Sequence, residues 1–423
     1  MNIEALHRIF LATKKISTDT RNIEPNSIFF ALKGEHFNAN SFTSEAIAKG
    51  AALVIIDEDA YEIPEKTFLV DDVLTTLQEL ANYHRNYLKL PIISLTGSNG
   101  KTTTKELINA VLLQKFKTVA TKGNLNNHIG VPLTLLSMQK DTELGIVEMG
   151  ANHQKEIEAL CKIAQPDYGY ITNFGKAHLE GFGGVEGVIK GKSELYDFLI
   201  SHNKTIFINE DDAIQLKKTT AYPNTFSFGE YSEKLKIKFL AADPMVTVQV
   251  DGLTIKSHLI GKYNFYNIAA AIAIGYYFEV DPSKIKKAIE HYIPSNNRSQ
   301  ILEKGDKTII LDAYNANPTS MKAALDNFAQ LSNLNKIAFI GDMLELGNEA
   351  EKEHQYIVDY ISELGLTNIF LIGKNFYKTK ASFPKYIDFT ALKENVNFST
   401  FSNAIILIKG SRGIALERIT ELL

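Results

Sequence analysis

Residues 91–104 read PIISLTGSNGKTTT, a short apolar run that leads into a glycine-rich turn. The run Pro91–Thr96 is bounded by proline and glycine, and it has the length of a buried parallel strand. A helix is expected after the turn, from Lys101 to Gln114. A strand, a glycine-rich turn and a helix in this order form the context of a phosphate-binding loop.

The turn carries the residue types that hold a triphosphate. Glycines let the backbone turn so that several N–H groups face one anion, and the start of the helix adds positive potential. Lys101 can bridge the β- and γ-phosphates, and the Thr102 hydroxyl can ligate Mg²⁺. The general motif has a further glycine where this chain has Leu95, so the loop is of a shorter Gly-x-x-Gly-Lys-Thr form. The alternative is a strand–helix turn that binds no ligand.

Further apolar runs extend this pattern toward the C-terminus. Strands are expected at Leu144–Met149, Tyr168–Asn173 and Thr205–Asn209, with helical stretches between them. Strands and helices alternating at this spacing predict a parallel sheet with helices on its faces. Over residues 225–260 the apolar runs become short, and apolar and polar residues alternate, which indicates a small antiparallel sheet. The segment Asn264–Phe278 is expected to be a buried helix.

The flanking segments predict two more α/β units. Before the phosphate loop, strands are expected at Ser27–Leu32 and Ala51–Asp57, and helices at Thr43–Lys49 and Asp71–Leu88. After it, apolar runs that are each followed by a helix-like stretch predict a Rossmann-like, doubly wound sheet. These runs are Thr308–Asp312, Lys336–Gly341, Thr367–Gly373 and Ala404–Lys409. We therefore expect three α/β domains, over residues 1–88, 89–293 and 294–423.

The bulk composition is that of a soluble globular protein, with 45% hydrophobic and 22% charged residues. A chain of 423 residues is longer than a single hydrophobic core usually supports, so several domains are expected. A net charge of −4 without a basic block argues against nucleic acid as the main partner. The single cysteine, Cys161, excludes an intrachain disulfide and a thiolate metal cluster. Residues 1–15 lack the apolar core of a signal peptide, and no apolar run is long enough to span a membrane, so we expect a cytoplasmic protein.

Polar residues follow two of the expected strands. Glu148 stands at the end of a strand and beside a glycine, where ligands bind to parallel sheets, so it is a candidate Mg²⁺ ligand. A surface or helix-capping glutamate is the alternative. His178 lies in a glycine-broken loop after the next strand, although a lone histidine is more often structural than a ligand. Lys192 falls in the following helix, where a lysine is usually solvated.

Taken together, these segments resemble the Mur ligases over nearly the whole chain. The matching segments are TGSNGKTTTK (96–105), GNLNNHIGVP (123–132), EMG (148–150), NFGKAHLEGFG (173–183), KGKSEL (190–195), LIGKYNFYNIAAA (259–271), LDAYNANPTSM (311–321), GDMLELG (341–347) and KGSRG (409–413). The last three most resemble the ligases of this family that add D-alanyl-D-alanine. Near the N-terminus, STDTRNIEPNSIFFALKG (17–34) resembles the uridine-nucleotide-binding domain.

The resemblance implies an ATP-dependent amide ligase of peptidoglycan precursor synthesis. Its substrates would be UDP-N-acetylmuramoyl-tripeptide and D-alanyl-D-alanine. The carboxylate of the tripeptide would attack the γ-phosphorus of ATP, giving an acyl phosphate and ADP. The dipeptide amine would then attack the acyl carbon, forming the amide as phosphate leaves. No protein nucleophile is needed, and the sequence has no Ser-His or Cys-His signature. A monomer of three packed domains is the expected state.

The resemblance also implies roles for individual residues. The triphosphate would be held by Gly97, Ser98, Asn99, Gly100, Lys101, Thr102 and Thr103. One Mg²⁺ would bind Thr102 and Glu148, and a second would bind His178 and Lys192, whose counterpart is carbamylated. The adenosine and phosphates would be contacted by Asn127, Asn267, Arg298 and Asp312. Thr20 and Arg21 would serve the uridine site, and Lys409, Ser411 and Arg412 the carboxylate of the dipeptide.

Some points stay open at this level. Phe37-Asn38-Ala39-Asn40 replaces an Asp-Gly-His-like stretch of the family, which leaves the uridine contacts undefined, and Lys190 is an alternative to Lys192. Another Mur-type ligase or a folylpolyglutamate-type synthase is a second functional reading. The uridine-like segment disfavours the folate enzyme, and the segments at 314–321 and 341–347 disfavour an earlier Mur step. A phosphate-loop switch that hydrolyses nucleotide without an amine is a third.

Overall fold

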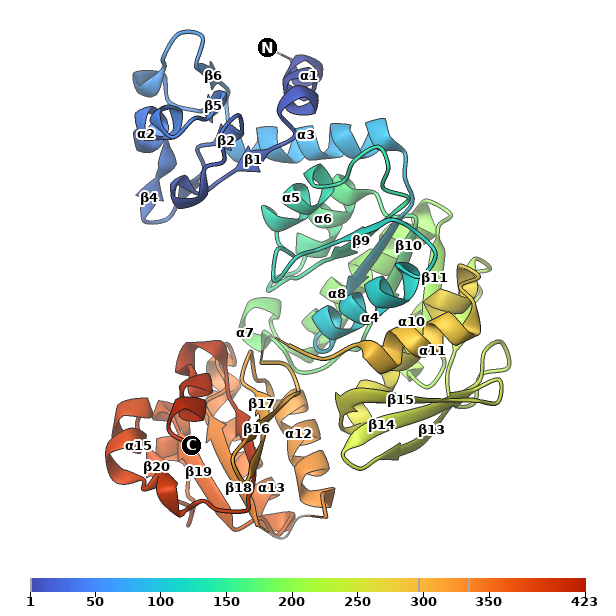
Figure 1. The fold of residues 1–423 in the computed structure, drawn as a ribbon, viewed down its shortest axis with the longest axis vertical. Helices are drawn as coiled ribbons and strands as arrows, with labels where there is room; N and C mark the ends of the chain where they lie inside the picture. The colour runs from blue at the N-terminus through green and yellow to red at the C-terminus, as the bar shows by residue number, and fades with distance from the viewer. Residues whose placement is uncertain (1, 296, 333–334) are drawn as a thin grey trace.

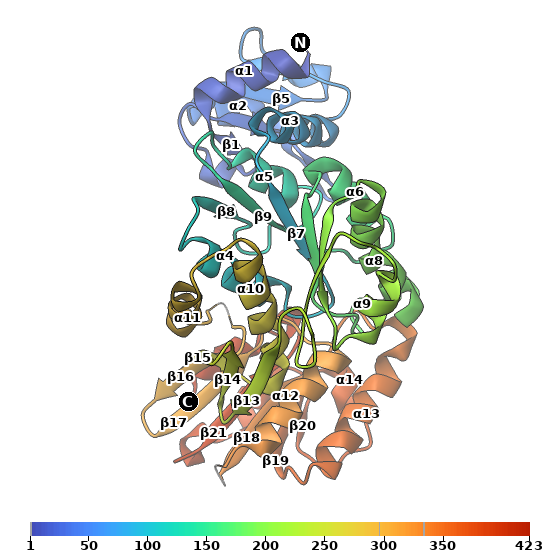
Figure 2. The same ribbon diagram turned by 90° about the vertical axis from the view of Figure 1, so that its right-hand side faces the viewer.

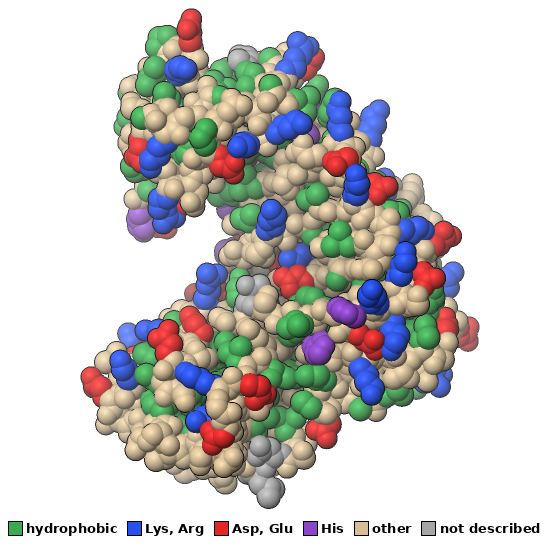
Figure 3. Space-filling view, viewed as in Figure 1, with side chains coloured by type: hydrophobic (Ala, Val, Ile, Leu, Met, Phe, Trp, Pro, Cys, Tyr) green, Lys and Arg blue, Asp and Glu red, His purple; other side chains and the backbone are tan. Residues whose placement is uncertain are grey.

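The computed structural model describes residues 2–295, 297–332 and 335–423. Three α/β segments follow one another along the chain, from blue to red in Figure 1. The first and last segments form the two ends of a crescent, and the space-filling view shows a hollow between them (Figure 3). None of the helices in these residues has the length and apolar character to cross a bilayer.

The N-terminal segment holds a four-stranded parallel sheet in the order β1-β2-β5-β6. Its strands are β1 (Ile16–Ser17), β2 (Ile28–Phe30), β5 (Leu53–Ile56) and β6 (Thr67–Leu69), and a hairpin is formed by β3 (Lys33–Gly34) and β4 (Phe37–Asn38). Its helices are α1 (Ile3–Thr13), α2 (Thr43–Ala48) and α3 (Val73–Leu88). Helix α3 begins after Asp72, whose side chain accepts a hydrogen bond from the Thr75 N–H, and it leads directly into the central segment.

The central segment contains a six-stranded parallel sheet in the order β12-β11-β10-β7-β9-β8. Its strands are β7 (Ile92–Thr96), β8 (Thr118–Ala120), β9 (Leu144–Glu148), β10 (Tyr168–Ile171), β11 (Thr205–Asn209) and β12 (Thr225–Phe228). Its helices are α4 (Lys101–Leu112), α5 (Gly130–Leu136), α6 (Glu156–Ala164), α7 (Leu179–Phe182), α8 (Val185–Ser201), α9 (Ala213–Lys218), α10 (Phe265–Tyr277) and α11 (Pro282–His291). Because side chains alternate along a strand, Ile92 packs in the core with α5, α6 and α8, and Ile93 packs with α4 and α10. Both faces of the sheet are therefore covered (Figure 2).

Residues 225–260 divide between two sheets. The expected small antiparallel sheet consists of β13 (Ile237–Ala242), β14 (Met245–Val250) and β15 (Leu253–Ile260). Strand β12 instead pairs in parallel with β11 at the edge of the central sheet. Helix α9 connects these two strands, and a helical crossover returns the chain to a parallel strand. The prediction of one antiparallel sheet over this stretch is therefore wrong for β12.

The C-terminal segment is built on a six-stranded sheet in the order β16-β17-β21-β18-β19-β20. Its strands are β16 (Gln300–Lys304), β17 (Lys307–Asp312), β18 (Lys336–Gly341), β19 (Asn368–Ile372), β20 (Lys385–Tyr386) and β21 (Ile405–Lys409). Its helices are α12 (Pro318–Gln330), α13 (Ala350–Glu363), α14 (Lys374–Lys378) and α15 (Phe389–Asn395). All neighbouring strands are parallel except β16, which pairs antiparallel with β17. The predicted α/β fold class is confirmed, and β16 and β20 are strands that the sequence pattern did not indicate.

Candidate nucleotide-binding active site

The site lies at the switch point of the central sheet, where the strand order reverses. In the sheet, β9 and then β8 lie on one side of β7, and β10, β11 and β12 lie on the other. Ligands of such sheets bind at the carboxyl ends of the strands beside this switch point. Here the carboxyl ends of β7, β9 and β10 border a cavity of about 960 Å³, and the facing wall comes from the C-terminal segment.

Two glycines fix the shape of the turn after β7. Gly97 has a φ of 144°, and a Cβ placed there would lie 2.0 Å from the Thr172 hydroxyl. Gly100 has a φ of 79°, and its Cβ would lie 2.4 Å from Asn267 Oδ1. Both positions therefore exclude side chains, for reasons of backbone conformation and of space.

The end of β10 holds the turn in place. The Asn173 side chain accepts a hydrogen bond from the Asn99 N–H at 3.0 Å and donates one to the Asn99 carbonyl at 2.9 Å. The Thr172 hydroxyl donates to the same carbonyl at 2.6 Å, and the Ser98 N–H donates to the Asn173 carbonyl at 3.1 Å. Asn173 thus shapes the phosphate loop, a role that its place at a strand end could have indicated.

Lys101 is the first residue of α4, and its side chain folds back onto the preceding turn. Its Nζ donates to the carbonyls of Gly97 at 2.7 Å and Ser98 at 3.3 Å. The pKa of Lys101 is lowered to about 8, mainly by burial; the charge of Glu148 opposes this shift, and the positive charge of Arg298 adds to it. The predicted phosphate-binding lysine therefore lies close to a cation from the C-terminal segment.

Glu148, at the end of β9, is the buried carboxylate of the site. Its Oε1 accepts hydrogen bonds from the Thr102 hydroxyl at 3.1 Å and from Asn126 Nδ2 at 2.8 Å. Its Oε2 is buried and has no hydrogen-bond partner in the part of the chain that the structure describes. An unpaired carboxylate oxygen beside a hydroxyl fits a hard cation such as Mg²⁺.

The described residues contain no group of three or more His, Cys, Asp or Glu side chains arranged to hold a metal ion. Mg²⁺ in a nucleotide site takes one or two protein ligands and completes its shell with phosphate oxygens and water. Asn126, which orients Glu148, was missed by the sequence analysis. It lies in the segment GNLNNHIGVP, but three asparagines there look alike in sequence.

Lys192 is buried on α8, contrary to the solvated position that is usual for a lysine. Its Nζ donates to the Ala151 carbonyl at 3.0 Å and lies 4.9 Å from the centre of the Phe182 ring. Burial, and then the charge of Lys101, lower the pKa of Lys192 well below its usual value. Lys190, on the same helix, is exposed.

His178 connects the central segment with the C-terminal one. It precedes α7 with a φ of 52°, and its Nδ1 lies 2.5 Å from Glu345 Oε2. This contact lowers the pKa of the Glu345 carboxyl. His178 lies at the cavity as expected, and Glu345 is a residue that the sequence analysis did not single out.

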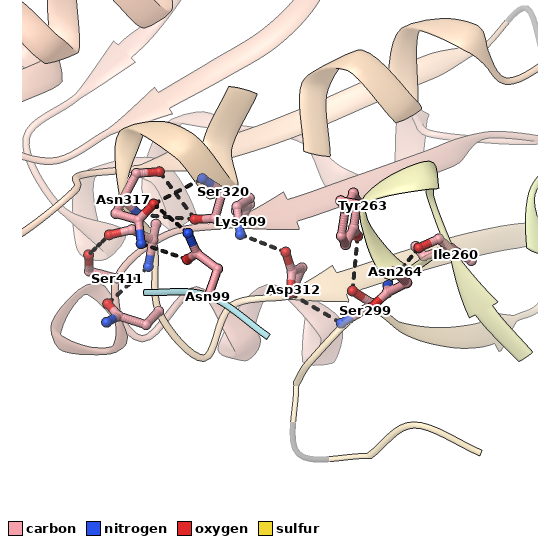
Figure 4. A network of polar contacts seen from close by, with 12 residues as sticks. Asn99, Ile260, Tyr263, Asn264, Ser299, Asp312, Asn317, Ser320, Lys409 and Ser411 are labelled. Atoms are coloured by element: carbon pink, nitrogen blue, oxygen red, sulfur yellow. Dashed lines mark hydrogen bonds and ion pairs between the residues drawn. The ribbon is translucent and has the colours of Figure 1, made fainter. Parts of the chain in front are cut away.

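Three predicted residues of the C-terminal segment, Asp312, Lys409 and Ser411, lie in the polar network of Figure 4. Asp312 accepts hydrogen bonds from Lys409 Nζ at 2.6 Å and from the Ser299 N–H at 3.1 Å. The Ser411 hydroxyl accepts from the Leu344 N–H at 2.9 Å and joins two loops. Lys409 is thus paired with a carboxylate, whereas Arg412 is exposed at the cavity.

Most of the predicted site residues line this one cavity. Those that do not are Gly97, Lys192, Thr20 and Arg21. Gly97 lies in the turn itself, and Lys192 lies behind Ala151, which is a lining residue. Thr20 and Arg21 belong to the N-terminal segment, where Arg21 forms an ion pair with Asp19 at 2.7 Å. Asn267 contacts the first turn of α4 through a hydrogen bond from the Thr104 hydroxyl, and Asn127 is an exposed lining residue.

Known proteins share this arrangement along nearly the whole chain. The Mur ligase middle domain matches residues 95–275, and the Mur ligase glutamate ligase domain matches residues 297–412. The UDP-N-acetylmuramoyl-tripeptide–D-alanyl-D-alanine ligase of Bacillus subtilis is 35% identical, over 96% of this chain and 92% of that protein. The crystal structure of MurF from Acinetobacter baumannii has a TM-score of 0.87 at 30% identity, and covers 97% of this chain and 93% of its own. MurF from Thermotoga maritima in complex with ADP has a TM-score of 0.84 at 26% identity, with 97% of both chains covered. The chain therefore belongs to the Mur ligase family, and within it to the MurF ligases.

Proposed function

We propose that this chain is an ATP-dependent ligase that joins D-alanyl-D-alanine to UDP-N-acetylmuramoyl-tripeptide through an acyl phosphate. The observation that carries the proposal is the convergence of three features in one cavity. These are the phosphate loop, the buried unpaired oxygen of Glu148 and the cationic residues of the C-terminal segment. The similarity to relatives that bear this name supports the choice of substrates.

The main electrostatic problem of the reaction is that a carboxylate must approach a triphosphate. The loop N–H groups and Lys101 would bind the phosphates, and Arg298 would add a second positive charge from the facing wall. Thr102 and Glu148 would hold one Mg²⁺, which supplies charge neutralisation when it is bound. His178 would serve a second ion, Asn127 and Asn267 the adenine, and Asp312 the ribose.

Lys192 is proposed to carry a carbamate. Carbon dioxide reacts with a neutral amine, and burial favours the neutral form of Lys192. The product, an anionic oxygen ligand, suits Mg²⁺ better than an ammonium group does. The exposed Lys190 has no such environment.

The three segments would divide the substrates between them. Residues 1–88 would bind the uridine nucleotide, with Thr20 and Arg21 at that site, and residues 89–293 would bind ATP. Residues 294–423 would deliver the dipeptide, whose carboxylate would meet Arg412, with Lys409 and Ser411 shaping the loop around it. We further propose that the protein acts as a monomer of three packed segments in the cytoplasm, where ATP is available.

The test is phosphate release together with detection of the new amide by mass spectrometry. Purified protein, ATP and Mg²⁺ would be supplied with UDP-N-acetylmuramoyl-tripeptides that end in diaminopimelate or in lysine, and with a panel of amines. We expect D-alanyl-D-alanine alone to stimulate release and to appear in the product. Stimulation by a single amino acid or by glutamate would instead indicate another acid–amino acid ligase, and release without any amine would indicate a switch.

A further inference from the structure

Two arginines from distant parts of the C-terminal segment meet at one aromatic ring. The guanidinium carbon of Arg298, ahead of β16, lies 3.6 Å from the centre of the Tyr314 ring. That of Arg412, after β21, lies 5.5 Å from the same point. All three residues line the cavity.

Among the described residues, neither arginine has an acidic partner. Within residues 2–295, 297–332 and 335–423, no ion pair is formed by Arg298 or by Arg412. Two long, flexible cations that face the same space repel each other and lose rotamer freedom when they are held. The negatively charged face of an aromatic ring attracts a guanidinium and offsets part of this cost.

The backbone around Arg298 is fixed to the strand that precedes Tyr314. The Tyr314 N–H donates to the Asn297 carbonyl at 3.2 Å, and the Ser299 N–H donates to Asp312 Oδ1 at 3.1 Å. Asn297 and Ser299 both have left-handed backbone conformations, with φ values of 58° and 49°. Asparagine tolerates this conformation, whereas for Ser299 it is costly and persists only where surrounding contacts hold it. The turn therefore presents Arg298 to the ring from a fixed backbone.

We propose that Tyr314 is a positioning residue whose ring holds Arg298 and Arg412 in place for two anionic reactants. Arg298 would face the terminal phosphate of ATP, and Arg412 would face the carboxylate of the incoming dipeptide. The inference rests on the proposed function. It assigns a role to the ring and none to the hydroxyl, since no hydrogen bond of that hydroxyl occurs in the described part of the molecule.

Two substitutions separate the ring from the hydroxyl. Tyr314→Phe keeps the ring, so we expect KM for ATP and KM for D-alanyl-D-alanine to stay within about twofold of wild type. Tyr314→Leu removes the ring, and we expect both KM values to rise about threefold to thirtyfold, the range of a lost cation–π contact. Tyr377→Leu is a matched control, because this exposed tyrosine on α14 is outside the cavity and also lies near a cation, Lys385.

A double-mutant cycle tests the coupling directly. In an Arg412→Ala background, adding Tyr314→Leu should leave KM for D-alanyl-D-alanine unchanged, while KM for ATP still rises. The proposal is overturned if Tyr314→Leu leaves both KM values at the wild-type level, or if Tyr314→Phe is as impaired as Tyr314→Leu. A wild-type protein that forms no amide would refute the proposed function instead. In that event, calorimetric titration with ATP would still test the contact of Tyr314 with Arg298.

Discussion

Asn317 Nδ2 donates a hydrogen bond to Asn99 Oδ1 at 2.7 Å, and Asn99 Nδ2 returns one to Asn317 Oδ1 at 3.4 Å (Figure 4). The first residue caps α12 of the C-terminal segment, and the second lies in the phosphate loop. Asn173, just after the end of β10, holds the backbone of Asn99. The side-chain amides of Asn99 and Asn317 therefore extend this hydrogen-bond network from the central sheet, through the loop, to α12. The position of the C-terminal segment is therefore linked to the shape of the predicted phosphate loop.

Asn317→Asp should separate this link from the helix cap. A carboxylate still accepts the Ser320 N–H that Asn317 Oδ1 accepts now, so the stability of α12 should be retained. The donor to Asn99 is lost and a negative charge is placed beside the loop, so we expect the affinity for ATP to fall about tenfold. Calorimetric titration with ATP would measure this change.

Asn317→Ala, by comparison, should lose both the link and about 1 kcal/mol of stability. Asp388→Ala serves as the control, because it removes the cap of α15, outside the cavity. An Asn317→Asp variant with wild-type affinity for ATP would show that the amide pair does not affect nucleotide binding.

Lys101→Ala should lower turnover by at least about two orders of magnitude, the scale of one lost contact to a developing charge. The pH profile gives a second and independent measurement. Because the pKa of Lys101 is about 8, its charge is present below that pH and is lost above it. We expect kcat/KM for ATP to fall as the pH rises through 8. Lys101→Arg, which stays charged, should not show that fall, and an identical profile in both proteins would count against the assignment.

Lys192→Ala should abolish ligation, because it removes the side chain proposed to carry a carbamate and the ligand oxygens that this carbamate would supply. Short carboxylates added to the buffer should restore part of the activity. Lys190→Ala is the matched control, since this lysine is exposed on the same helix. Carbon-13 NMR of the protein in labelled bicarbonate should show one carbamate signal in wild type and in Lys190→Ala. A signal that persists in Lys192→Ala would place the modification elsewhere.

The sequence could predict the site residues that belong to a pattern of residues adjacent in the chain. Lys101 and Thr102 follow a strand and a glycine turn within one short segment, so the local pattern identified them. Glu148 was predicted in the same way, from its place at the end of a strand. The shift of β12 into the central sheet was missed because a short alternating run does not show which sheet it will join.

The parts that sequence could not predict depend on contacts between distant segments. The burial of Lys192 comes from Ala151 and Phe182, which approach it only in the folded chain. The same holds for Asn317, which contacts a residue 218 positions away, and for the ring of Tyr314. Helical or strand periodicity carries no information on such pairs.

A buried pair of histidines joins the N-terminal segment to the central one, and it makes stability dependent on pH. His84 Nε2 lies 3.0 Å from the Met138 carbonyl, so it carries the proton of that bond. His84 Nδ1 is then the acceptor, and His7 Nε2, at 2.9 Å, is the donor. Burial, and then the proximity of His84, lower the pKa of His7 from 6.5 to about 4. Both rings are therefore neutral in the folded protein at neutral pH.

This arrangement fixes the sign of the pH effect. The unfolded chain binds a proton at His7 below pH 6.5, whereas the folded chain does so only near pH 4, so stability falls as the pH drops through this window. At pH 5 the loss from His7 is about 2 kcal/mol. Urea unfolding at pH 7.5 and pH 5 would measure it, and His7→Gln, which keeps a donor without the titration, should lose less stability between these conditions than wild type. His36→Gln removes an exposed histidine of the same segment and should behave as wild type. An equal loss in His7→Gln and in wild type would show that the pair does not control stability in acid.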